Sequence, residues 1–138
     1  MSEIATQVGT SPEGPQFDFE RHRHDAEERY RRIRPLHQDF CATVVRLLND
    51  ILLPLAGVVH SVVARAKEVD SFGIKAMKPL ESDPGTPKYK SPVDEITDLS
   101  AARIITYFLD TVEDIDRAVS DQFEIIEKGD RSELLRED

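Results

Sequence analysis

Four polar side chains close together in the sequence, three of them cationic, are suited to binding an anion. They form the pattern Arg65-x-Lys67-x-x-x-Ser71-x-x-x-Lys75. A strand period of two places Arg65 and Lys67 on one face, and a helical spacing of four places Ser71 above Lys75. A helix that starts just after a cationic strand end also favours an anion there, because its free amides and the positive end of its dipole point to the same place. The segment therefore predicts a phosphate site, with a solvated basic strand end as the alternative.

A carboxylate and an arginine follow further along the chain. Asp98 and Arg103 stand five residues apart, at the entrance of an apolar, β-favouring stretch. A rigidly held carboxylate is the hard oxygen ligand that Mg²⁺ prefers, with phosphates and water completing the shell. Because five is odd, a regular strand would place the two side chains on opposite faces. Both serve one site if a bulge intervenes or if Asp98 precedes the regular strand.

Together the two segments resemble the synthetase domain of the RelA/SpoT family. That domain carries R-x-K-x-x-x-S-x-x-x-K and, after a loop, D-[LI]-x-[AG]-x-R and an apolar strand. The resemblance runs from Gly57 to Glu127, roughly half the chain. It implies a nucleotidyltransferase-like α/β fold and a role in guanosine tetraphosphate and pentaphosphate (alarmone) metabolism. In that family a diphosphate passes from ATP to the 3′-hydroxyl of GDP or GTP, a reaction governed by positioning and charge neutralisation.

The resemblance also implies a role for each residue of the two segments. It assigns the adenine of ATP to Arg65 and Arg103, the phosphates to Lys67, Ser71 and Lys75, and Mg²⁺ to Asp98. These residues make up the donor half of the family's active site.

The acceptor half has no counterpart. Family members continue with a G-Y-x-S-x-H loop, whose Tyr stacks the guanine, and an E-x-Q strand, whose Glu completes the metal site and serves as the base. The sequence to Asp138 contains neither pattern, and its loop between Lys75 and Asp98 is longer than the family's. We therefore assign no catalytic residue and expect this chain alone to make no measurable alarmone. Two alternatives are a RelA/SpoT-type toxin that modifies tRNA and a non-catalytic remnant that binds nucleotide or a partner protein.

Two further segments resemble functional motifs without completing them. The run from Leu109 to Asp114 matches the H-D-x-x-E-D pattern of alarmone hydrolases except that Leu109 replaces the metal-binding His. Asp110 and Glu113 are better explained as a helix cap. The run from His22 to Asp25 is interpreted as a solvated charged helix, because residues two apart on a helix point in different directions.

Periodicity predicts the elements that position these residues. We expect an α/β or α+β fold in which a mixed sheet is flanked by helices. The domain boundaries are a disordered leader 1–16, N-terminal helices 17–54, a partial synthetase-like domain 55–128 and an acidic tail 129–138. The predicted elements are an exposed helix 17–34, a break at Pro35, an apolar-striped helix 36–53, a strand 58–67, a helix from Asp70 or Ser71 to 78, a loop 79–92, a strand 96–108, a helix 110–120 and a strand 122–127.

Composition limits the class of partner. Apolar residues make up 39% of the chain and charged residues 33%, which is typical of a soluble globular protein. The net charge of −9 disfavours general nucleic-acid or membrane-surface binding, since both partners are polyanions. Cys41 is the one cysteine, and no apolar run approaches the length of a membrane span. We expect a cytoplasmic protein, and an incomplete sheet edge would favour homo-oligomers.

Overall fold

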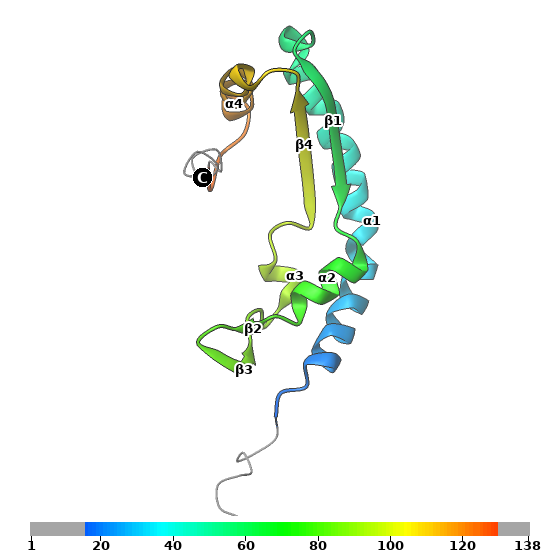
Figure 1. Ribbon diagram of the computed structural model, residues 1–138. Coiled ribbons are helices and arrows are strands. Elements are labelled where there is room, and N and C mark those ends of the chain that lie inside the picture. The colour runs from blue at the N-terminus through cyan, green and yellow to red at the C-terminus, as the bar shows by residue number, and fades with distance from the viewer. Residues whose placement is uncertain (1–15, 130–138) are drawn as a thin grey trace, which may run out of the picture. The chain divides into compact units, whose positions relative to one another are not determined.

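The computed structural model describes residues 16–129, in which helices alternate with short strands (Figure 1). The predicted combination of helices and sheet is confirmed, but two small antiparallel sheets, β1-β4 and β2-β3, replace the single mixed sheet. The elements are α1 (Phe19–Ile51), η2 (Leu53–Leu55), β1 (Val59–Ala66), α2 (Val69–Ala76), β2 (Pro79–Leu80), β3 (Asp83–Pro87), α3 (Pro92–Glu95), β4 (Ser100–Thr106), η3 (Leu109–Thr111) and α4 (Val112–Ser120). The predicted leader and tail lie outside the described residues apart from Gln16 and Gly129.

The chain divides into two compact units. The first takes in the chain up to Phe40 together with Arg65–Ala101, and the second takes in Cys41–Ala64 and the chain from Ala102 onward. Five of the six predicted site residues fall in the first unit, so their geometry is described within it. Among the described helices, none is both long enough and apolar enough to cross a membrane.

The helix α1 runs without interruption through Pro35, so the predicted break there is wrong. It begins where Asp18 Oδ1 accepts a hydrogen bond from the Arg21 amide at 3.0 Å, as an N-cap residue does. A proline inside a helix removes one hydrogen bond and costs about 3 kcal/mol. Tertiary contacts next to the proline keep the chain on its helical course, because Arg34 bonds the residue directly after β1 and His37 bonds the first residue of β4.

The core of the first unit lies between α1, α2 and the segment around α3. Tyr30 and Phe72 are both 0% exposed and stack with ring centroids 4.4 Å apart. The prediction of an exposed helix over residues 17–34 is therefore wrong in part, since one face of that stretch is buried. The cluster consists of Ala26, Tyr30, Phe72, Ala76, Ile96 and Leu99, bordered by Ile33, Val69, Tyr89 and Val93.

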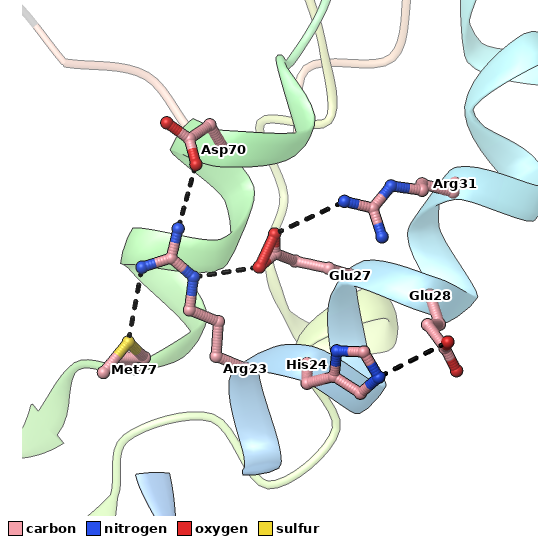
Figure 2. Close-up of polar contacts among 7 residues, drawn as sticks. All are labelled: Arg23, His24, Glu27, Glu28, Arg31, Asp70 and Met77. Carbon is pink, nitrogen blue, oxygen red and sulfur yellow. Dashed lines mark hydrogen bonds and ion pairs between the residues drawn. The ribbon is translucent and has the colours of Figure 1, made fainter. Parts of the chain in front are cut away.

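The helix α2 packs directly on α1 at Gly73. A Cβ added there would lie 2.7 Å from Arg23 Nε and 2.7 Å from Glu27 Cδ, so any larger residue would require these two flexible side chains to move. Figure 2 shows Arg23 between the helices, where its guanidinium donates to Glu27 Oε1 and Asp70 Oδ1, both at 2.9 Å. A third contact reaches Met77 Sδ at 3.7 Å. Arg23 therefore binds both ends of α2.

The stretch from 79 to 92, predicted as a loop, contains a small hairpin in the structure. The strands β2 and β3 pair antiparallel, with Pro79 opposite Pro87 and Leu80 opposite Asp83. Asp83 stabilises the turn because its carboxylate accepts hydrogen bonds from the Gly85 amide and the Thr86 hydroxyl. The prolines exclude a longer ladder, since each lacks an amide donor.

The strand prediction for 58–67 is confirmed by β1, and its partner β4 is shorter than the predicted 96–108. The Lys67 amide bonds the Leu99 carbonyl at one end of the pair, and the Tyr107 amide bonds the Val58 carbonyl at the other. The strands are therefore antiparallel. Because β4 begins at Ser100, Asp98 precedes the regular strand, which is one of the two arrangements that the odd spacing allows.

In the second unit, α4 confirms the predicted helix, but its capping is not as predicted. Thr111, not Asp110, is the N-cap residue, and its side chain makes no cap hydrogen bond. The predicted strand 122–127 is wrong, because residues 121–129 contain no strand. Ile125 and Ile126 favour extended backbone, yet they lie 47% and 94% exposed. Such residues form a strand only when a neighbouring strand completes the hydrogen-bond ladder.

Candidate functional site

Both predicted phosphate-binding lysines converge on the predicted magnesium ligand. Lys67 Nζ lies 3.1 Å from Asp98 Oδ2, and Lys75 Nζ lies 3.2 Å from Asp98 Oδ1. Lys67 follows β1 directly, Lys75 lies on α2 and Asp98 precedes β4. Two adjoining segments and a third that is distant in sequence therefore place their charged groups at one point.

A small pocket of about 180 Å³ opens beside this ion triad. Ser71 reaches it from the third residue of α2, where the helix amides and dipole favour an anion. The predicted cap at Asp70 or Ser71 is wrong, since the N-cap residue is Glu68, whose side chain makes no cap hydrogen bond. The pocket is lined by Arg65, Lys67, Glu68, Ser71, Asp98 and Ala101.

The charges of the triad are partly shielded from water. The side chains of Lys67, Lys75 and Asp98 are 19%, 27% and 46% exposed. Burial by itself raises the pKa of Asp98, but hydrogen bonds from Lys67 and Lys75 outweigh it, and the pKa lies below its ordinary value of 3.8. Asp98 is therefore an anion at neutral pH and keeps both lysines beside the pocket.

Acid should weaken this triad. Because the pKa of Asp98 is lower in the folded state, its stabilising contribution is present above pH 3.8 and is lost as the pH falls through the folded value. Asp98 is nearly half exposed, so we expect at most about 1 kcal/mol of unfolding free energy from this source. Urea unfolding at a series of pH values should show a shallower acid loss in Asp98→Asn than in the wild type. Parallel profiles for the two proteins would contradict the assignment.

Arg65 and Arg103 belong to different units of the chain. Arg65 is exposed and lines the pocket. Arg103 lies on the part of β4 that belongs to the second unit, outside the group of residues described above. The role that the resemblance gives to Arg103 stays a prediction.

The two incomplete motifs are found in other settings. His22 Nε2 lies 2.7 Å from the Tyr89 carbonyl oxygen, and His24 Nε2 lies 3.4 Å from Glu28 Oε1 on the next turn. Over residues 16–129, no group of three or more His, Cys, Asp or Glu side chains is arranged to hold a metal ion. Asp110 lies in the short helix η3.

A larger groove of about 460 Å³ in the same unit has a different character. Its one titratable side chain is His37, whose Nδ1 lies 2.8 Å from Ser100 Oγ. Without a cationic lysine or arginine it does not suit a phosphate. Its lining residues are Leu36, His37, Phe40, Ile96, Thr97, Leu99 and Ser100.

The sequence patterns did not identify the α1 side chains that support the site. Tyr30 and Arg34 both bond the Lys67 carbonyl, and Arg23 bonds the first turn of α2. A signal was present, since Ala26, Tyr30 and Ile33 recur at helical spacing within the charged stretch and indicate a buried face.

Comparison of this chain with protein-family models, curated proteins and solved structures finds no match. Any functional assignment therefore depends on the residues of the site and on the sequence resemblance.

Proposed function

We propose that the pocket beside Asp98 binds the phosphates of ATP together with Mg²⁺. In this proposal it is the donor half of a RelA/SpoT-type synthetase, which transfers a diphosphate from ATP to the 3′-hydroxyl of GDP or GTP. The observation that carries the proposal is the convergence of Lys67 and Lys75 on Asp98, next to Ser71 at the start of α2. A bare ion triad needs neither a helix N-terminus nor an open pocket, whereas a phosphate site uses both.

The charges around the pocket suit an incoming polyphosphate. Three cations (Arg65, Lys67 and Lys75) face two carboxylates (Glu68 and Asp98), which leaves a formal charge of 3 − 2 = +1. When phosphate oxygens arrive, the two lysines exchange the Asp98 carboxylate for them. Flexible lysine side chains with three donors each allow such an exchange with little movement of the backbone.

The residues present fit a magnesium ion brought in with the nucleotide. Mg²⁺ in such sites is held by one or two carboxylates, while phosphates and water supply the other ligands. Asp98 would hold the ion once the lysines turn to the phosphates, and Glu68 is the other carboxylate of the lining. When bound, the ion would neutralise charge on the phosphate oxygens.

The volume of the pocket indicates which part of ATP it holds. Pockets that enclose a whole small molecule measure about 300–1,000 Å³, compared with about 180 Å³ here. The pocket therefore suits the phosphates, and the nucleoside would extend beyond it. In this proposal Arg65 at the rim stacks on the adenine, and the sequence resemblance assigns Arg103 to the same base.

Titration of ATP in the presence of Mg²⁺ tests this proposal. We expect Arg65→Ala and Lys75→Ala each to bind more weakly than the wild type, and Lys75→Ala by about 1–3 kcal/mol for the charged hydrogen bond lost. Lys78→Ala is the matched control, because Lys78 is an exposed lysine just past the end of α2. Equal affinities for the wild type, Lys75→Ala and Lys78→Ala would exclude the pocket as the phosphate site.

A further inference from the structure

The backbone of Lys67 is held from both sides. Its carbonyl oxygen accepts a hydrogen bond from the Tyr30 hydroxyl at 2.6 Å and another from Arg34 Nε at 3.0 Å. Its amide donates to the Leu99 carbonyl at 2.8 Å. A carbonyl oxygen has two lone pairs, so the two α1 side chains satisfy it fully. The adjacent residues are bound too, since Arg34 also pairs with Glu68 at 3.2 Å.

Tyr30 connects this carbonyl to the helix that carries the other lysine. Its ring is fully buried and stacks on Phe72 of α2, with an interplanar angle of 28°. Lys75 lies on the same helix, one turn further along, and shares Asp98 with Lys67. One side chain of α1 therefore contacts both segments from which the two lysines project.

We propose that Tyr30 and Arg34 are positioning residues, which hold the Lys67 carbonyl so that the Lys67 ammonium stays at the pocket. The inference rests on the proposed phosphate-binding function of that pocket. A lysine side chain has a flexible four-carbon stem, and a fixed backbone origin lowers the entropy that is lost when the ammonium binds a ligand.

Packing alone does not explain these two residues. A phenylalanine would stack on Phe72 equally well, so the Tyr30 hydroxyl serves the carbonyl and not the core. Arg34 donates its Nε–H to the same oxygen, while its Nη2 bonds the carboxylate of Glu68. Charge-assisted hydrogen bonds of this kind are stronger than neutral ones. Both donors therefore act on the residue from which one site lysine projects.

The experiment compares Tyr30→Phe, Arg34→Met and the double variant, each titrated with ATP in excess Mg²⁺. We expect a loss of affinity of roughly three- to tenfold in Tyr30→Phe and a larger loss in the double variant, as for hydrogen bonds of ordinary strength. Tyr89→Phe is the matched control, since Tyr89 borders the same core and its hydroxyl bonds no described residue. Urea unfolding of each variant confirms that the proteins compared are folded.

Two further readouts distinguish positioning from general loosening. In a Lys67→Ala background, Tyr30→Phe should cause no additional loss of ATP affinity, because the side chain it positions is gone. The inference would be overturned, while the proposed function stands, by either of two results. One is an equal loss of ATP affinity from Tyr30→Phe in the wild-type and Lys67→Ala backgrounds. The other is no loss of ATP affinity when Tyr30→Phe is combined with Arg34→Met. If the folded wild type binds no ATP, the proposed function fails, and amide hydrogen exchange at Lys67 decides the inference. Faster exchange at Lys67 in the double variant but not in Tyr89→Phe supports it, and unchanged exchange overturns it.

Discussion

Replacing Phe72 with alanine should destabilise the protein by about 3–5 kcal/mol, the range measured for a buried phenylalanine. Phe72 is 0% exposed, and its ring stacks on Tyr30 in the only buried cluster that joins α1 to α2 in the described part of the chain. Truncation removes the transfer free energy of the ring and leaves a cavity between the helices. A small domain has about 5–15 kcal/mol of stability in total, so the variant should unfold at a much lower urea concentration.

Ile74→Ala is the matched control for this experiment. Ile74 lies on the same helix two residues further on, but its side chain is 58% exposed. We expect that substitution to change the unfolding free energy by less than about 1 kcal/mol, as surface positions usually do. Urea unfolding followed by circular dichroism measures both. Similar losses in Phe72→Ala and Ile74→Ala would show that α2 does not pack on α1 as described.

Removing both site lysines should abolish detectable ATP binding. In Lys67→Ala with Lys75→Ala, two charged hydrogen bonds to phosphate are lost at about 1–3 kcal/mol each, which corresponds to a weakening of roughly 30-fold or more. The two effects should not add simply, because both lysines share Asp98. The Asp98 carboxylate, without its two lysine partners, would also repel the nucleotide.

The control for the double variant keeps the overall charge equal. Lys78→Ala with Lys88→Ala also removes two lysines, both outside the pocket, from a chain whose net charge is already −9. Long-range repulsion by the whole protein should weaken ATP binding similarly in both double variants. A loss of equal size in the two would mean that net charge, not the pocket, governs the affinity.

Local patterns predicted the elements near the site well. The β-branched residues of 58–67 form β1, and the change from period two to helical spacing after Lys67 marks α2. The helix α2 makes its own local hydrogen bonds, and β1 pairs with β4, a strand of strong β-propensity. Sequence and structure therefore agree for both elements. The separation of Asp98 from Arg103 also indicated that Asp98 could precede the strand, as it does.

Tertiary contacts explain the elements that were mispredicted. At Pro35 the local rule favours a break, but contacts of the neighbouring Arg34 and His37 maintain one helix. Around Ile125 the local rule favours a strand, but no partner strand lies beside those residues in the described chain. In each case the outcome depends on residues distant in sequence, which spacing does not reveal.

The sequence also did not reveal the α1 residues that hold the site, because their contacts are with residues distant in sequence. Tyr30 and Arg34 lie in a densely charged stretch that resembles a solvated helix, and their target is a backbone carbonyl, which has no signature in the sequence. Residue types and spacing could identify the charged groups of the pocket, but not the α1 groups that hold them in place.

The most direct test is calorimetric titration of ATP into the wild type and Asp98→Asn, each with and without Mg²⁺. We predict that the wild type binds ATP and that Mg²⁺ strengthens this binding. In Asp98→Asn the strengthening by Mg²⁺ should be much smaller, because the amide is a poorer ligand than the carboxylate for a hard cation. Absence of binding by the folded wild type, or the same response to Mg²⁺ in both proteins, would contradict the assignment of this pocket to ATP and magnesium.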